Sequence, residues 1–245
     1  MVPAIEARGL TKRYGDTTAV EGLDLTVEAG SVFGFLGPNG AGKTTTMRML
    51  TTLTKPTEGE ATVAGADVRE RAAVVSNIGY LPEEPPLFEE FTGREMLEYY
   101  AGLRDIDDPD ARIDDLLSRF GLEDAADRRT DGYSKGMKQK TAIAAAILHR
   151  PDVLFLDEPT SGLDPRAART VRETLADLAA ADTTVFLSTH ILPVVEELAD
   201  TVGVLYDGSI VASGAPAELT ARAEAGGGGT LEDVFLEVTG GTGER

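Results

Sequence analysis

The 245-residue chain carries 42 acidic and 23 basic side chains, and its net charge of −19 argues against a general nucleic-acid-binding protein, which needs a basic face. With 42% hydrophobic residues and no Cys, it is expected to fold, and disulfides and thiolate metal sites are excluded. Apolar runs stay well short of the roughly 18 residues of a membrane-spanning helix, and residues 1–10 lack the features of a secretory signal. We therefore expect a soluble, intracellular chain.

The acidity has two interpretations. Asp and Glu are spread along the whole chain, and most of the basic residues are Arg rather than Lys. A solubilising surface would account for the charge. Adaptation to molar salt would also account for it, because screening over a few ångströms removes the repulsion between like charges. The scarcity of Lys favours salt adaptation.

Strand and helix patterns alternate along the chain, which predicts a mostly parallel α/β core. Residues 5–10 and 23–27 are predicted strands, and they indicate a small antiparallel sheet at the start. Residues 31–36 form an apolar strand that leads into Gly37, and a helical pattern begins at Lys43. Residues 78–81 are predicted as a buried strand, which a proline-rich turn follows.

Between residues 88 and 130 the pattern changes to acidic helices, which we interpret as an insertion in the α/β core. Asp108-Pro109 marks a helix start and Gly121 its end. The apolar face of this helix consists of Ile113, Leu116, Leu117 and Phe120.

Core strands are predicted again at residues 153–156, 184–188 and 202–206, and a hairpin turn at Asp207-Gly208. A flexible linker is predicted from Gly226 to Gly229. Beyond it, helical spacing of apolar residues predicts a short helix with Leu231, Val234, Phe235 and Val238 on one face. We expect this helix to dock on its own domain; binding to a partner is the alternative.

The strongest functional signal is Gly37-Pro-Asn-Gly-Ala-Gly-Lys43-Thr44, which matches the phosphate-binding loop G-x-x-x-x-G-K-[ST] between a predicted strand and a predicted helix. Its glycines let successive N–H groups point at phosphate oxygens, and the helix N-terminus adds positive charge. Lys43 would bridge the β- and γ-phosphates, and Thr44 would coordinate Mg²⁺. The flanking elements argue against a glycine-rich turn without chemical meaning.

Two carboxylates, Asp157 and Glu158, follow the apolar strand of residues 153–156. The carboxyl edge of an open α/β sheet is where ligands bind. Asp157 is therefore a candidate Mg²⁺ ligand, and Glu158 a candidate general base that polarises an attacking water. Such a pair alone is also typical of a solvated strand end, but the phosphate loop nearby favours the catalytic interpretation.

Taken together, the chain resembles the ATP-binding subunit of ABC (ATP-binding cassette) transporters over nearly all its length. Residues 133–137, Tyr-Ser-Lys-Gly-Met, stand where that family has its signature, usually Leu-Ser-Gly-Gly-Gln. Ser134 and Gly136 match, and the other three residues depart. With Lys138-Gln139 after it, this variant resembles the branch that pairs with small exporter-type permeases. Ser134 alone would be read as a helix N-cap.

The resemblance implies roles for further residues. Tyr14 matches the aromatic residue that stacks on adenine, although a strand-edge tyrosine needs no ligand. Residues 161–164, which end in Asp164, resemble the loop that crosses the dimer interface; an ordinary turn before a helix opening with Pro165 is the alternative. His190 resembles the switch histidine that contacts the γ-phosphate. His149, in contrast, is expected to complement a helix dipole.

One position departs from the family pattern in a way that concerns the site. The family usually has Gln after the segment 78–82, where this chain has Glu83. In the family that Gln contacts Mg²⁺ and links the nucleotide site to the permease. A carboxylate also ligates Mg²⁺, so Glu83 is a candidate metal ligand.

Three groups of site residues are thus predicted. The catalytic residues are Lys43, Glu158 and His190, and the Mg²⁺ ligands are Thr44, Glu83 and Asp157. The residues that contact ATP are Tyr14, Gly37, Pro38, Asn39, Gly40, Ala41, Gly42, Lys43, Thr44, Thr45, Ser134, Gly136 and Asp164.

The fold implied by the resemblance is an α/β phosphate-loop NTPase core of the ABC type, with an N-terminal antiparallel β subdomain and a helical insertion. We expect this ATPase domain over residues 1–225, its helical subdomain at about 88–140, and a linker with a short helix over 226–245.

The function implied is ATP hydrolysis that powers export through a separately encoded transmembrane permease, from the cytoplasmic face of the membrane. Two copies would close head to tail around ATP, each phosphate loop facing Ser134 of the other copy. A soluble ABC-type ATPase of DNA repair, translation or cluster assembly is the second candidate. A module that binds ATP without cleaving it is a third, which the presence of Lys43, Asp157, Glu158 and His190 disfavours.

Overall fold

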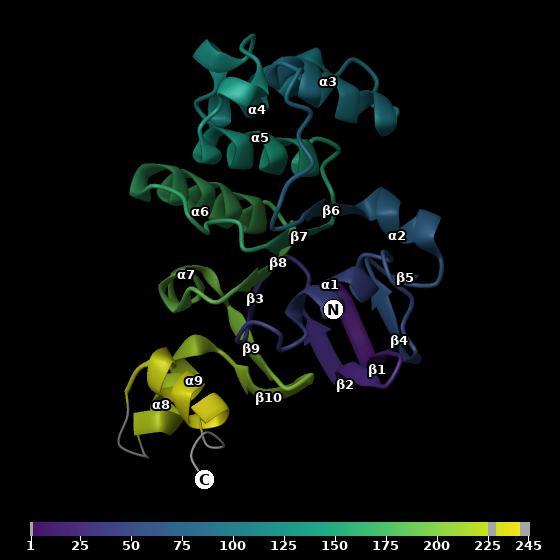
Figure 1. Ribbon diagram of the computed structural model, residues 1–245, viewed down its shortest axis with the longest axis vertical. Coiled ribbons are helices and arrows are strands. Elements are labelled where there is room, and N and C mark those ends of the chain that lie inside the picture. Colours follow the sequence, from purple (N-terminus) through teal and green to yellow (C-terminus); the bar gives the residue numbers. More distant parts are fainter. Residues whose placement is uncertain (1, 225–228, 241–245) are drawn as a thin grey trace.

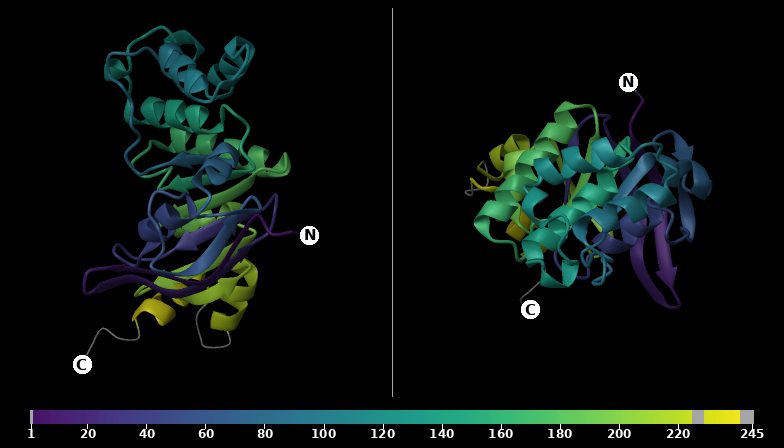
Figure 2. Two further views of the ribbon diagram at one scale, coloured as in Figure 1. Left: turned by 90° about the vertical axis from the view of Figure 1, so that its right-hand side faces the viewer. Right: turned by 90° about the horizontal axis from the view of Figure 1, so that it is seen from above.

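The computed structural model describes residues 2–224 and 229–240, and two sheets with helices at both ends make up the molecule. In Figure 1 helices α3 (Gly93–Leu103), α4 (Asp110–Arg119) and α5 (Lys135–Ile147) lie at one end, and α8 (Pro216–Glu224) and α9 (Leu231–Gly240) at the other. The left-hand view in Figure 2 shows the same order, with both sheets between the two groups of helices.

The N-terminal sheet is antiparallel, as predicted, and has the order β2-β1-β4-β5. Its strands are β1 (Ile5–Tyr14), β2 (Thr17–Val27), β4 (Glu58–Val63) and β5 (Ala66–Asp67). Both β1 and β2 are longer than expected, because together they form a hairpin in which Tyr14 pairs with Thr17. Along β2 the buried residues Leu23, Leu25 and Val27 alternate with exposed ones, which is typical of a sheet with one buried face.

The central sheet has the order β10-β9-β3-β8-β7-β6. Its strands are β3 (Val32–Leu36), β6 (Ile78–Leu81), β7 (Val153–Asp157), β8 (Thr184–Thr189), β9 (Thr201–Tyr206) and β10 (Ser209–Gly214), and only the hairpin of β9 with β10 is antiparallel. All residues of β3, β7 and β8 are buried, as expected for strands covered on both faces. Consequently, the carboxyl ends of these three neighbouring strands meet at one edge of the sheet.

Helices α3, α4 and α5 follow one another between β6 and β7, joined in part by short 3-10 turns at Glu123–Ala125 and Thr130–Gly132. Helix α3 begins with a capping box formed by Thr92 and Glu95. The predicted apolar face of α4 is buried, and Gly121 follows the helix with a positive φ of 61°. These helices share a hydrophobic core with α5 and α6 (Pro165–Ala180).

The remaining helices pack against strands of the two sheets. They are α1 (Lys43–Leu50), α2 (Arg71–Asn77) and α7 (Leu192–Leu198), in addition to α8 and α9. Leu231 and Val234 of α9 are buried in one cluster with Val202 and Val204 of β9, so the C-terminal helix docks on its own chain, as expected. The predicted glycine linker lies, up to residue 228, outside the described residues. In the part of the chain described, none of the helices combines the length and apolar character of a membrane span.

The expectation for His149 was wrong. Helix α5 ends at Ile147, and the Nε2 of His149 lies 2.9 Å from the carbonyl oxygen of Ile78, at the start of β6. Since a carbonyl only accepts, Nε2 carries the proton. Burial, and then the charge of Arg104, lower the pKa of His149, which favours the neutral ring. His149 thus ties the end of α5 to β6 and does not supply a charge to the helix dipole.

Candidate active site

The phosphate loop connects the end of β3 to α1 and depends on two glycines for its shape. Gly42, with φ of 108°, precedes the first helical residue, Lys43. A Cβ added at Gly42 would lie 2.5 Å from the backbone oxygen of Ala19, and one at Gly37 would lie 2.5 Å from that of Leu205. Because neither position has room for a side chain, the glycine pattern of the sequence has a steric cause here.

Lys43 lies buried inside this loop. Its Nζ donates to the carbonyl oxygens of Gly37 at 2.6 Å and Pro38 at 3.2 Å. Burial lowers the pKa of Lys43, whereas the nearby carboxylates of Glu158, Asp157 and Glu83 act in the opposite direction. A buried ammonium among carboxylates, held by loop carbonyl oxygens, is suited to hold the charge of a polyphosphate.

Oxygen ligands for a hard cation meet beside this lysine. The hydroxyl of Thr44 donates to Oδ2 of Asp157 at 3.0 Å, although the two residues are far apart in the sequence. Across the described residues, no group of three or more His, Cys, Asp or Glu side chains forms a complete metal site. The hydroxyl of Thr44 and the carboxylate of Asp157 fit Mg²⁺, because proteins bind this ion through one or two carboxylates, and waters and substrate phosphates supply its other ligands.

Glu158 is held in a strained and specific position. Its φ is 50°, and its N–H donates to the carbonyl oxygen of Ser188 at 2.8 Å. The Oε2 atom accepts from the hydroxyl of Thr189 at 2.9 Å, and Oε1 lies 2.7 Å from Nδ1 of His190. Such strain persists only where surrounding contacts enforce it, and it concentrates at functional sites. Thr189, at the end of β8, and His190, which follows it, thereby orient both oxygens of this buried carboxylate.

These groups line one cavity of 220 Å³ at the carboxyl edge of the central sheet. It is formed by Ala19, Pro38, Asn39, Gly40, Gly42, Lys43, Thr44, Thr45, Glu83, Asp157, Glu158 and His190. All of these except Ala19 were candidates from the sequence or the resemblance. Ala19 belongs to β2, and a small residue in a polar strand gives no sequence signal; only the fold places it beside Gly42.

Six other candidates, Tyr14, Gly37, Ala41, Ser134, Gly136 and Asp164, do not line the cavity. Ser134 caps α5, accepting from the N–H of Met137 at 3.3 Å, and Asp164 caps α6, accepting from the N–H groups of Arg166 and Ala167 at 3.0 Å. A Cβ at Gly136 would lie 2.9 Å from Cβ of Ala167, so the turns that carry Ser134 and Asp164 pack closely together. Tyr14 is half exposed at the end of β1.

A polar cavity at the end of a parallel sheet, with a phosphate loop and an oriented carboxylate, defines a phosphate-loop ATPase. A family model described as "ABC transporter" matches residues 20–161. The daunorubicin resistance ATP-binding protein DrrA3 of Streptomyces coeruleorubidus is 44% identical over 97% of this chain and 75% of its own length. The ABC transporter ATP-binding protein NatA of Bacillus subtilis (strain 168) is 42% identical, over 80% and 82% of the two chains.

Two further comparisons agree with these. The bacitracin transport ATP-binding protein BcrA of Bacillus licheniformis is 39% identical over 86% of this chain and 69% of its own. A solved structure described as an ATP binding subunit of an ABC transporter superposes with a TM-score of 0.88 and 30% identity, covering 96% of this chain and 99% of that one. The chain belongs to the ABC transporter family. It is an ATP-binding subunit of a transporter and an ATPase.

Proposed function

We propose that the cavity binds MgATP and that Glu158 acts as the general base of hydrolysis. The observation that carries this proposal is the arrangement of Glu158, whose carboxylate is fixed by Thr189 and His190 in the cavity that holds Lys43. Glu158 takes a proton from the attacking water. Lys43 balances phosphate charge, and His190 keeps Glu158 oriented and approaches the γ-phosphate.

Thr44, Asp157 and Glu83 are the residues that would hold Mg²⁺, which neutralises charge on the β- and γ-phosphates when it is bound. The contact of Thr44 with Asp157 supports two of these assignments, and the presence of Glu83 in the cavity supports the third. Around the phosphates we assign backbone or side-chain contacts to the loop from Gly37 to Thr45. Tyr14 is assigned to the adenine base.

The functional unit is a head-to-tail dimer. Ser134, Gly136 and Asp164 are candidates that do not line their own chain's cavity, but they lie in two closely packed turns, which begin α5 and α6. A second copy would bring this surface over the γ-phosphate, so that hydroxyl and N–H donors of one copy complete the site of the other. Their position outside the cavity supports this arrangement.

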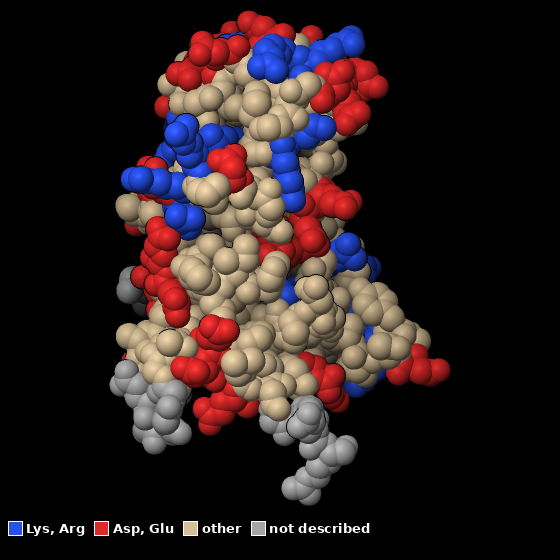
Figure 3. All heavy atoms as spheres, turned by 60° about the vertical axis from the view of Figure 1, so that its left-hand side comes forward, with Lys and Arg blue, Asp and Glu red and all other residues tan. Residues whose placement is uncertain are grey.

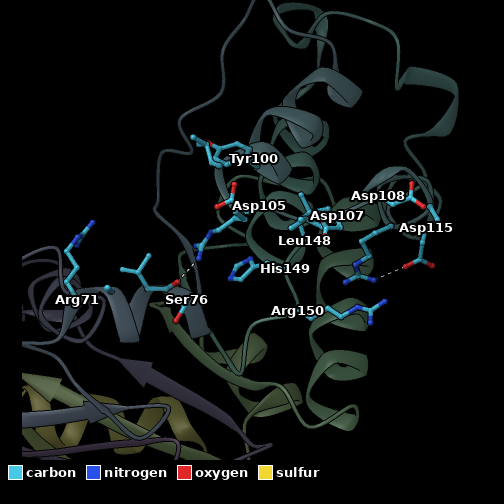
Figure 4. A pocket seen from close by; sticks show the side chains of 17 residues that line it. Arg71, Ser76, Tyr100, Asp105, Asp107, Asp108, Asp115, Leu148, His149 and Arg150 are labelled. Atoms are coloured by element: carbon cyan, nitrogen blue, oxygen red, sulfur yellow. Dashed lines mark hydrogen bonds and ion pairs between the residues drawn. The ribbon is translucent and has the colours of Figure 1, made fainter.

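A second groove, separate from the nucleotide cavity, lies beside the helical insertion and is suited to a cytoplasmic segment of the permease. The groove has a volume of 1740 Å³ and lies between the ends of α2, α3, α4 and α5. Figure 4 shows Asp105, Asp107 and His149 around the hollow, with Arg71 and Arg150 at its borders. Residues of both charge signs and the apolar Leu103 favour an amphipathic helix as occupant.

The floor of this groove connects to the nucleotide cavity. Arg104 donates to the carbonyl oxygens of Val75 at 2.5 Å and Ile78 at 3.3 Å, and His149 contacts the same Ile78 oxygen. Strand β6 begins at Ile78 and leads to Glu83. A permease segment in the groove would therefore act on Glu83 through a single short strand.

The names of two relatives support a proposal for the cargo class. Two of them are named for resistance to daunorubicin and for transport of bacitracin. By analogy, we assign export of an antibiotic or drug-like compound to the transporter, with this subunit on the cytoplasmic face of the membrane.

Hydrolysis should depend on both the nucleotide and the metal. We expect the purified chain to release phosphate from ATP in the presence of Mg²⁺, and chelation of Mg²⁺ to reduce that release to background. A phosphate-release assay at saturating ATP, with and without EDTA, measures this. If a folded chain releases no phosphate from MgATP, or releases it equally with EDTA, the proposed function is contradicted.

We also propose adaptation to high salt. Figure 3 shows Asp and Glu side chains spread over the whole face drawn, whereas Lys and Arg gather mainly in the half that carries the helical insertion. Because molar KCl screens the repulsion of a −19 charge, the melting temperature should rise by several degrees from dilute buffer to molar KCl. For a chain of this size about 1 kcal/mol corresponds to about 2–4 °C. Thermal melts in both buffers measure the shift, and an equal or lower value in KCl would contradict the adaptation.

A further inference from the structure

Lys12 contacts Tyr14 at the end of β1. The proposed function assigns Tyr14 to adenine but gives no role to Lys12. The Nζ of Lys12 lies over the ring of Tyr14, 5.0 Å from the ring centroid. A cation over the face of an aromatic ring is attracted to its π-electrons. The contact therefore restrains a side chain that is otherwise 48% exposed.

The ammonium is itself anchored. Its Nζ donates to the carbonyl oxygen of Lys55 at 2.7 Å, in the loop between α1 and β4. Neither the carbonyl nor the ring carries a negative charge, so the positive charge of Lys12 stays available to the ring. Lys12 is half-buried, and this geometry does not depend on an exposed ion pair.

Tyr14 lies on the hairpin that borders the nucleotide cavity. It pairs with Thr17 of β2, and Ala19, two residues further along, lines the cavity beside Gly42. Two residues of a strand span about 7 Å. The ribose and base of a nucleotide whose phosphates occupy the loop extend by a comparable distance, which brings the base past Ala19 to Tyr14.

We propose that Lys12 is a positioning residue for the nucleobase. Its ammonium covers one face of the Tyr14 ring and fixes the ring, so that the other face receives adenine. The base then stacks on a side chain that has little freedom left to lose on binding. The inference rests on the role of Tyr14 in the proposed function.

The test compares two ligands in molar KCl, where long-range charge effects are screened. Calorimetry would measure the affinity for the Mg²⁺ complex of the nonhydrolysable imido analogue of ATP, and for Mg²⁺ tripolyphosphate, which lacks a base. Lys12→Met is expected to weaken binding of the analogue roughly two- to fivefold and to leave tripolyphosphate unchanged. Lys12→Arg should restore the affinity for the analogue, because a guanidinium also stacks on the ring.

Lys55→Met is the matched control, because it removes a lysine charge at the same corner and keeps the carbonyl that anchors Lys12. It should change neither affinity. In Tyr14→Ala, which should bind the analogue more weakly, adding Lys12→Met should have no further effect.

Two different failures can be told apart. If Tyr14→Ala binds the analogue as the wild type does, the assignment of Tyr14 to adenine is wrong. If Tyr14→Ala is weakened but Lys12→Met is not, or if Lys12→Met weakens tripolyphosphate by the same factor, the inference about Lys12 is overturned and Tyr14 keeps its role.

Discussion

Replacing Lys43 by Ala is expected to weaken MgATP binding by at least about tenfold and to lower hydrolysis by about 10²–10³-fold. The ammonium of Lys43 lies buried in the cavity that Glu83, Asp157 and Glu158 also line. Without it, the phosphates would meet these three carboxylates with no lysine between them. The loss should therefore affect the ground state and the transition state alike, since both carry the phosphate charge.

The measurement is calorimetry with the nonhydrolysable ATP analogue, together with a phosphate-release assay. Lys138→Ala is a matched control, because Lys138 forms a salt bridge with Glu89 at 3.2 Å outside the nucleotide cavity. Its affinity and rate should equal those of the wild type. Circular dichroism would show whether Lys43→Ala keeps the fold. Wild-type affinity for MgATP in a folded Lys43→Ala variant would contradict the assignment.

The geometry of the candidate site was predictable from the sequence where it depends on local pattern. The phosphate loop is such a case, because its glycines, Lys43 and Thr44 are contiguous and the loop geometry follows from steric limits at Gly37 and Gly42. Asp157 and Glu158 are another, since an apolar strand that ends in carboxylates places them at a known edge of the sheet.

Features that depend on packing between distant segments were not predictable. Residues 11–22 are mostly polar, so the hairpin of β1 and β2 was longer than expected and the position of Ala19 at the cavity was missed. No pattern indicates the positive φ of Glu158, which follows from contacts with β8. The interpretation of His149 was wrong because its partner, Ile78, comes from a strand far away in the sequence.

Replacing Glu158 by Gln is expected to separate ATP binding from hydrolysis. The amide has the shape of the carboxylate, and its oxygen can still accept from the hydroxyl of Thr189, but it cannot take a proton from water. Loss of a general base lowers the rate by about 10²–10⁴-fold. Binding should persist or tighten, because Lys43, Thr44 and Asp157 are unchanged and one negative charge near the γ-phosphate is gone.

If two subunits close only around intact ATP, a variant that binds without cleaving should stay closed. We therefore expect Glu158→Gln with MgATP to elute as a dimer on size-exclusion chromatography with light scattering, and as a monomer with MgADP. Molar KCl belongs in the buffer, because each copy carries a charge of −19. Glu84→Gln, the same change at an exposed carboxylate that does not line the cavity, should remain monomeric as MgATP is consumed.

The same experiment tests which surface closes the site. Ser134 is exposed and accepts a single hydrogen bond from the N–H of Met137, so Ser134→Arg should be tolerated by the fold. In the head-to-tail arrangement the added side chain would occupy the space between Ser134 of one copy and the γ-phosphate in the other. Adding Ser134→Arg to Glu158→Gln should therefore abolish the dimer while each chain still binds MgATP. A dimer that survives this change would place the interface elsewhere. If Glu158→Gln alone stays monomeric at MgATP concentrations far above the ATP dissociation constant, the head-to-tail unit is contradicted for the isolated subunit.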